Sequence, residues 1–90
     1  ALPLYPEVLD LAQSGVRTGG DARNRTAVGR HVTIASGVSQ AFGAVAFDPQ
    51  TSGGLLAAVD ARTADELTSR DSPFRRIGRV ISGEPGLVLV

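Results

Sequence analysis

The chain has 90 residues, of which 42% are hydrophobic, and its nine arginines balance nine acidic residues. This length suits one small domain, and the net charge of zero gives no electrostatic reason to expect nucleic acid or an anionic membrane as a partner. Cysteine and lysine are absent, which excludes disulfides, thiolate metal sites and a cysteine nucleophile. No stretch reaches the ~20 apolar residues of a membrane span and no signal peptide is recognised, so we expect a cytoplasmic location and no membrane partner.

The first third of the chain is predicted to form two short helices. Residues 6–14 place apolar side chains at helical spacing, and Gly15 stands where a helix is commonly capped. Asp21 is expected to cap a second helix over residues 22–28. Gly29 then ends that helix.

The middle of the chain, residues 32–46, fits no single pattern. Val32 and Ile34 alternate as in a short strand, while residues 38–42 are compatible with one helical turn. His31 is the only histidine, and no second histidine, cysteine or close acid accompanies it as a metal set would require. We therefore interpret it as a polar or capping residue.

The second half is predicted to contain strand, helix and hairpin. Residues 55–59 form an apolar run that is typical of a strand covered on both faces. Thr63 and Glu66 stand at capping-box spacing at the start of a helix. Residues 74–81 are predicted to be a strand, and residues 87–90 are predicted to close a hairpin with it. Helices among few strands indicate an α+β fold, with helices packed on one mixed β-sheet.

The most distinctive stretch is residues 48–56, in which turn-forming residues run directly into the apolar segment. Pro49 fixes its own φ, while the pair Gly53-Gly54 lets a ligand approach the backbone. Thr51-Ser52 adds two hydroxyl groups. These residues fit an ordinary tight loop, and they also fit a loop that holds phosphate oxygens with backbone N–H groups. A Walker loop is excluded because no Gly-Lys-Ser/Thr follows.

This stretch, DPQTSGGLL, resembles a signature of the selenophosphate synthetase family, the selenide, water dikinases. Two more motifs occur in the family's order: residues 19–24, GGDARN, resemble its GGxxRN segment, and residues 77–80, IGRV, resemble its IGxV strand. The ordered set is more specific than any one motif. It covers nearly all of this chain, but only the last portion of the family's length.

The resemblance implies a fold for residues 1–90. It is the C-terminal domain of the aminoimidazole ribonucleotide synthetase superfamily, a layered mixed β-sheet with packed helices that is partly ferredoxin-like. The chain resembles roughly the second half of that domain, so we expect an incomplete single domain without the catalytic N-terminal ATP-binding domain.

The resemblance also implies an activity, which converts selenide, ATP and water to selenophosphate, AMP and phosphate. The family uses a cysteine or selenocysteine and a lysine, neither of which this chain contains, so we expect the chain alone to be inactive. ATP and Mg²⁺ are the implied cofactors of the full-length enzyme, and none is expected on these 90 residues. The implied partners are the N-terminal domain, a second copy in a homodimer, and selenide as substrate.

No catalytic or metal-binding residue is expected here. The resemblance implies that ten residues support the nucleotide cleft: Gly19, Gly20, Arg23, Asn24, Asp48, Gln50, Thr51, Ser52, Gly53 and Gly54. By residue type the Asn24 amide would bond local backbone, whereas the family pattern favours an outward amide facing an anionic ligand. We expect the turn at 19–24 and the loop at 48–54 to lie on the same side of the domain.

Two other interpretations remain open. The chain is compatible with a non-catalytic small-molecule-binding or dimerisation module, because small α+β domains often pair through helices or sheet edges. It is also compatible with a sister ATP-dependent enzyme of the same superfamily. Neither explains DPQTSGGLL as well as the selenophosphate synthetase resemblance does.

Overall fold

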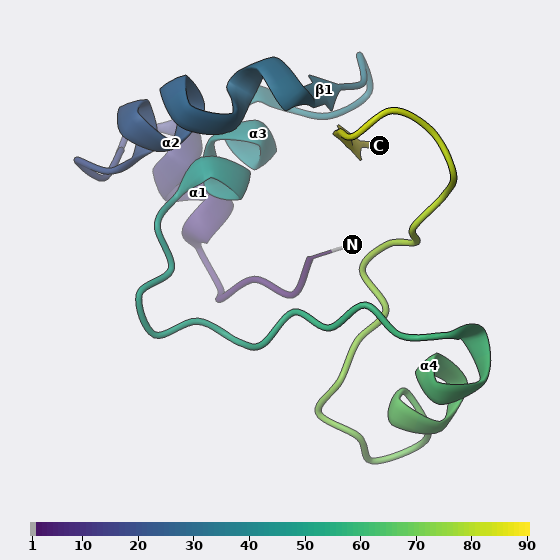
Figure 1. Ribbon diagram of the computed structural model, residues 1–90. Helices are drawn as coiled ribbons and strands as arrows, with labels where there is room; N and C mark the ends of the chain where they lie inside the picture. The colour runs from purple at the N-terminus through teal and green to yellow at the C-terminus, as the bar shows by residue number, and fades with distance from the viewer. Residues whose placement is uncertain (1) are drawn as a thin grey trace. The chain divides into compact units, whose positions relative to one another are not determined.

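A computed structural model describes residues 2–90, and Figure 1 shows its course. The described residues form four α-helices, one 3-10 helix and one two-stranded parallel sheet, which confirms the α+β class. They divide into two compact units. We call Tyr5–Ser52 with Gly83–Val90 the helical unit, and Gly53–Ser82 with residues 2–4 the extended unit.

Helix α1 (Val8–Gln13) begins later than predicted and ends as predicted. Glu7, at the N-cap, has a left-handed φ of 67°, so the helix cannot continue back into residue 6. At the other end Gly15 has φ +93°, a conformation that glycine adopts without strain. The N–H groups of Gly15 and Val16 donate to carbonyls of the last turn at 3.3 and 3.0 Å, which completes a Schellman cap.

Helix α2 (Asp21–Val28) has the predicted end but a different cap. Gly20 occupies the N-cap position without a side-chain hydrogen bond, so the prediction that Asp21 caps the helix is wrong. The Asp21 carboxylate instead accepts from the Arg25 guanidinium at 3.1 Å, because the two residues are one helical turn apart. After Val28 the chain tightens into the 3-10 helix Gly29–His31.

Helix α3 (Gln40–Phe47) has eight residues and is longer than the single turn that the sequence suggested. The Ser39 hydroxyl caps it by accepting from the Phe42 N–H at 3.1 Å. Helices α1 and α2 both pack against α3 in the helical unit (Figure 1). The core lies here, and its buried hydrophobic residues among those described are Ala12, Ala44 and Phe47.

The sheet pairs β1 (Val32–Ile34) with β2 (Leu87–Leu89) in parallel. Val32 lies opposite Leu87, and the Ala35 N–H extends the pairing by donating to the Leu89 carbonyl at 2.9 Å. The prediction of a strand at Val32 and Ile34 is confirmed. The prediction that residues 87–90 close a hairpin is wrong, because β2 pairs in parallel with the distant β1.

The extended unit lacks both of its predicted strands. Residues 55–59 and 74–81 have no assigned secondary structure and belong to no sheet, since the sheet within the described residues contains only β1 and β2. Leu55 and Val80 are 91% and 85% exposed, so the apolar runs are not covered as predicted. An apolar run becomes a strand only where a neighbour accepts its backbone hydrogen bonds.

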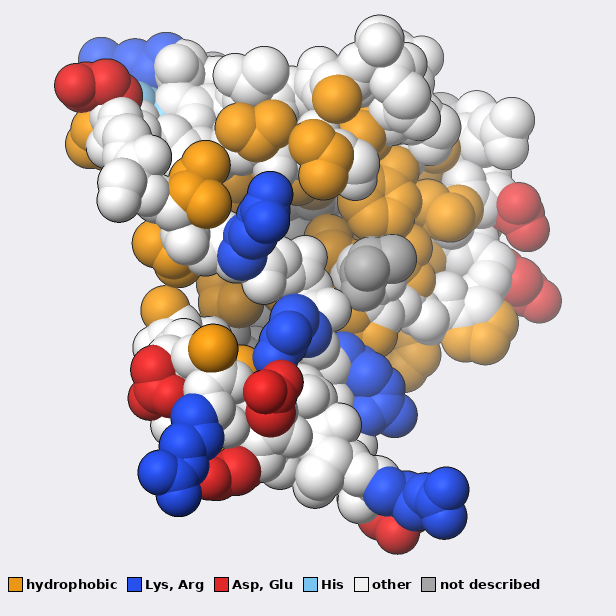
Figure 2. Space-filling model, turned by 90° about the vertical axis from the view of Figure 1, so that its right-hand side faces the viewer, with side chains coloured by type: hydrophobic (Ala, Val, Ile, Leu, Met, Phe, Trp, Pro, Cys, Tyr) orange, Lys and Arg blue, Asp and Glu red, His pale blue; other side chains and the backbone are white. Residues whose placement is uncertain are grey.

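Helix α4 (Ala61–Leu67) is capped by Asp60, and the predicted capping box that starts at Thr63 is wrong. The Asp60 carboxylate accepts from the Thr63 backbone N–H at 2.9 Å and from its hydroxyl at 2.8 Å, and these bonds lower the pKa of Asp60. Glu66 pairs with Arg62 at 3.1 Å. Figure 2 shows acidic and basic side chains intermixed over α4. No helix within residues 2–90 has the length and apolar character needed to cross a membrane.

Candidate functional site

Two regions that overlap the segments predicted to share a site, residues 19–24 and 48–54, meet in the helical unit. We call them the paired turns: residues 18–24, which include the first turn of α2, and residues 47–50 at the end of α3. The Thr18 hydroxyl donates to Oδ1 of Asp48 at 2.7 Å, although the two are 30 residues apart in sequence. The Gln50 amide donates to Oδ2 of the same carboxylate at 2.6 Å. Asp48 is thus held by side chains from both turns.

Gly20 is required by close packing of the paired turns. A Cβ atom built on Gly20 would lie 2.6 Å from Cγ of Pro49, far closer than such atoms approach. The φ of Gly20 is −87°, so the requirement is for space and not for an unusual backbone conformation. Gly54, in contrast, has no atom within 4 Å of its Cβ position among the described residues. Of Gly19, Gly20 and Gly54 in the predicted site, the sterically restricted glycine is therefore Gly20.

Asn24 joins α2 to α3. Its Nδ2 donates to the carbonyl oxygen of Phe47 at 2.8 Å in a partly buried bond. The outward amide that the family pattern favoured is therefore wrong, and the bond reaches a distant carbonyl instead of local backbone. The physical reason is that the last carbonyls of a helix have no partner within it, so Asn24 supplies one to α3. The Arg25 guanidinium carbon also lies 4.3 Å from the centre of the Phe47 ring, within cation–π range.

The structure brings together only part of the predicted set. Gly20, Asn24 and Asp48 make contacts between the paired turns, and Gln50 donates to Asp48. Three more predicted residues are exposed on the helical unit and make no side-chain hydrogen bond within residues 2–90: Arg23, Thr51 and Ser52. Gly19 is exposed as well. Gly53 and Gly54 belong to the extended unit. Residues 48 and 49 lie against the turn at 18–24, and the expectation that the whole loop at 48–54 shares its side of the domain stays a prediction.

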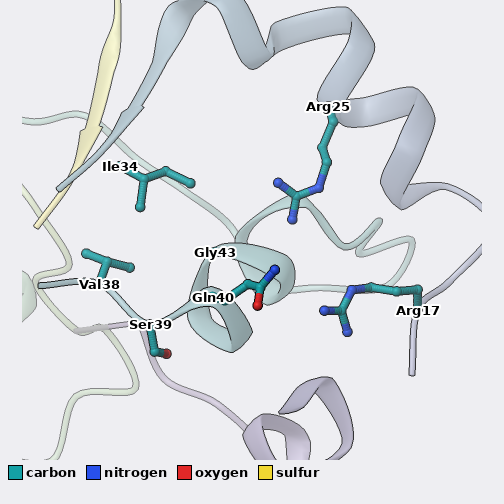
Figure 3. A pocket seen from close by; sticks show the side chains of 7 residues that line it. All are labelled: Arg17, Arg25, Ile34, Val38, Ser39, Gln40 and Gly43. Atoms are coloured by element: carbon teal, nitrogen blue, oxygen red, sulfur yellow. The ribbon is translucent and has the colours of Figure 1, made fainter. Parts of the chain in front are cut away.

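Sequence reasoning missed a cavity of about 270 Å³ in the helical unit. Figure 3 shows its lining, which includes Arg17, Arg25, Ile34, Val38, Ser39 and Gln40. None of the ten predicted site residues lines it. The sequence contains the two arginines of this cavity eight positions apart. Because Arg17 lies in a link and Arg25 lies on a helix, hydrophobic periodicity could not show that their side chains converge.

The paired turns contain one aspartate at their contact, Asp48, whose two oxygens already accept hydrogen bonds. Within residues 2–90 no three or more His, Asp or Glu side chains gather closely enough to hold a metal ion. What the arrangement offers chemically is a hydrogen-bonded junction beside exposed donors.

Comparisons with known proteins show what the chain resembles. It is 40% identical over 95 aligned positions to the selenide, water dikinase of Nitratidesulfovibrio vulgaris strain Hildenborough, and the match covers 98% of this chain and 27% of that protein. The enzyme of the same name from Pseudomonas straminea is 39% identical over 89 positions, covering 93% of this chain and 25% of the relative. That from Pelobacter propionicus is 44% identical over 68 positions, with 76% and 20% covered.

Searches against protein-family models and against solved structures gave no match. The chain spans about a quarter of the length of the curated relatives that it matches. The matches nevertheless run along almost all of its own residues and come from several bacteria under one name. Over the segment that it shares with them, the chain therefore belongs to the family of the selenide, water dikinases.

Proposed function

We propose that this chain serves in an enzyme that makes selenophosphate from selenide, ATP and water and releases AMP and phosphate. Within that enzyme it forms part of a C-terminal domain with the superfamily's layered sheet and helices, and the paired turns support one wall of the nucleotide cleft. The observation that carries this role is the Thr18–Asp48 hydrogen bond, which joins the residue just before one family-like motif to the first residue of another motif, 30 positions away in sequence.

The chain's own residues fit a positioning role. The Asn24 and Thr18 bonds hold the turns together, while the backbone of Gly19, the Arg23 guanidinium and the hydroxyls of Thr51 and Ser52 remain exposed as hydrogen-bond donors. Such donors suit the phosphate oxygens of ATP. ATP, when bound, supplies the phosphoryl group.

The reacting groups are assigned to other parts of the enzyme. This chain has no cysteine and no lysine, and its described residues gather no acidic cluster for Mg²⁺. The proposal includes a homodimer in the cytoplasm. The exposed apolar side chains of Leu55 and Val80 in the extended unit favour contact with more protein.

The test uses a full-length selenide, water dikinase that carries this segment. Gly20→Ala should push the paired turns apart, because its Cβ cannot fit 2.6 Å from Pro49. A displacement of about 1 Å can cost roughly 100-fold in rate, so kcat/KM for ATP should fall strongly. Gly37→Ala makes the same chemical change where nothing lies within 4 Å, and its activity should stay close to that of the parent.

Thermal melts of both variants separate loss of positioning from loss of folding. Full activity of Gly20→Ala in a folded enzyme would contradict the role of the paired turns. Phosphorus NMR of the 90-residue chain with ATP, selenide and Mg²⁺ should show no selenide-dependent AMP. Formation of AMP above a blank would contradict the assignment of chemistry to other parts of the enzyme.

A further inference from the structure

The cavity of the helical unit gathers positive charge with no facing acid among its lining residues. Arg17 lies in the link between α1 and α2, Arg25 lies on α2, and Gln40 begins α3. Figure 3 shows both guanidinium groups pointing toward the Gln40 amide. Two like charges directed into one cavity repel each other, and an anion between them would remove that cost.

Arg17 is held in place by backbone. Its Nη1 donates to the carbonyl oxygens of Ala12 and Val16 at 2.6 and 2.7 Å, near the C-terminal end of α1, where a cation is favourable. Within residues 2–90 its other guanidinium nitrogens have no hydrogen-bond acceptor. One edge of the group is thus fixed while the rest is available to a ligand.

Arg25 is held in place by two side chains. Its Nε donates to the Asp21 carboxylate at 3.1 Å, and its plane rests over the buried Phe47 ring. Neither Nη of Arg25 has an acceptor in the described part of the chain. Asp21 neutralises one of the two charges, so the cavity keeps a net excess of one positive charge. Because the guanidinium groups are already positioned, binding would cost little further ordering.

The remaining wall defines the size and kind of ligand. The Gln40 amide adds a neutral hydrogen-bonding group, and Ile34 and Val38 form an aliphatic side. A volume of about 270 Å³ lies just below the range of pockets for drug-sized ligands, which begins near 300 Å³. The cavity therefore has room for an anionic group with a compact organic part.

We propose that this cavity binds the phosphate group of a small metabolite through Arg17, Arg25 and Gln40. The donors come from three separate segments and approach a bound group from different directions, which suits the tetrahedral oxygens of phosphate better than a planar carboxylate. The site is separate from the proposed nucleotide role, since it contains none of the residues assigned to that role.

The first experiment titrates inorganic phosphate into the 90-residue chain, with chloride adjusted to constant ionic strength, and follows the arginine Nε–H signals by NMR. Saturable shifts are expected at Arg17 and Arg25, and acetate should bind more weakly than phosphate. Shifts that do not saturate, or equal binding of acetate, would overturn the proposal.

The second experiment uses Gln40→Glu, which keeps the side-chain size and places a carboxylate between the two arginines. This carboxylate also lies in the first turn of α3, where a negative charge stabilises a helix, so the variant should fold at least as well as the parent. Phosphate affinity should fall at least about tenfold. Unchanged affinity would contradict the site even if arginine variants proved unstable.

Arg17→Gln should also weaken phosphate binding, by about tenfold. Arg79→Gln is the matched control, because it makes the same charge change at an exposed residue of the extended unit, outside the cavity. Its phosphate affinity should stay within about twofold of the parent. An equal loss in both variants would show that overall charge, and not this cavity, attracts phosphate.

Discussion

The helical unit buries some of its apolar residues, whereas the extended unit buries none among the residues described. The buried hydrophobic residues of the described chain, Ala12, Ala44 and Phe47, all belong to the helical unit. In the extended unit Leu55 and Leu56 are 91% and 81% exposed. Apolar character alone therefore does not make a core. Burial follows where a second element packs against the first, as α1 and α2 do against α3.

The longest-range side-chain hydrogen bonds of the helical unit connect residues that are farther apart in sequence than those of the extended unit. In the helical unit side-chain bonds join residues 23 and 30 positions apart, at Asn24 and Thr18. In the extended unit the longest connection, from Arg76 to Asp65, spans 11 positions and lies on the surface. Distant bonds hold elements together, whereas exposed local pairs add little. Stability should accordingly be concentrated in the helical unit.

The largest expected effect comes from Phe47→Ala. Phe47 is 7% exposed and lies beneath Arg25, so its truncation should lower the free energy of unfolding by about 3–5 kcal/mol. Leu55→Ala, at a side chain that is 91% exposed, should change it by less than about 0.5 kcal/mol. Urea denaturation followed by circular dichroism measures both. Equal losses would show that the two units do not differ in stability.

A smaller loss is expected from Asn24→Ala, which leaves the Phe47 carbonyl without its 2.8 Å partner. The cost should be about 1–3 kcal/mol, typical of a buried acceptor left unsatisfied. The neighbouring Arg23→Ala, at an exposed position of the same helix, is the control and should be nearly neutral. A neutral Asn24→Ala would mean that the bond between α2 and α3 does not stabilise the fold.

Glu7→Gly should stabilise the helical unit slightly. Glu7 has a left-handed φ of 67°, which costs a non-glycine residue roughly 1–2 kcal/mol. Glycine removes this strain, but its larger loss of backbone entropy on folding offsets part of the gain. The net gain should be about 1 kcal/mol or less, visible as a raised Tm. Asp71→Gly makes the corresponding change at φ 73° in the extended unit. A larger gain in global stability from Asp71→Gly would contradict the expectation that stability is concentrated in the helical unit.

The smallest effect is local and depends on pH. Hydrogen bonds from Thr63 lower the pKa of Asp60 below its ordinary value of 3.8. Because the folded pKa is the lower one, the cap stabilises α4 above pH 3.8 and is lost as pH falls through the folded pKa. NMR shifts of residues 61–67 should report fraying in acid, and Asp60→Asn should remove that dependence. Fraying at an unchanged pH in Asp60→Asn would rule out the cap as its cause.

The sequence predicted features that depend on local chemistry. Gly15 ends α1 because a left-handed residue is needed there, and the alternation of Val32 and Ile34 correctly indicated β1. The DPQTSGGLL motif identified the family that the relatives then showed. The contact between Gly20 and Pro49 was not predicted, although the two segments that contain them were expected to lie on the same side of the domain.

Features that depend on a distant partner were not predictable from one sequence. The apolar runs at residues 55–59 and 74–81 have strand composition, but nothing in them specifies a neighbouring strand. Asp60 and Thr63 are both good capping residues, and only the geometry shows which of them accepts the hydrogen bond. The convergence of Arg17 and Arg25 likewise depends on how the link before α2 packs against α3.

The parallel pairing of β1 with β2 sets the order in which the chain can fold. The helix contacts of the helical unit lie within residues 8–47, and they can form as soon as α3 has been synthesised. The sheet needs Leu87, so the 52 residues from 35 to 86 must close into a loop for only three paired positions. Loop closure of this kind is slow and carries an entropic cost. The helices should therefore assemble first, with the sheet joining late, after synthesis of the last strand.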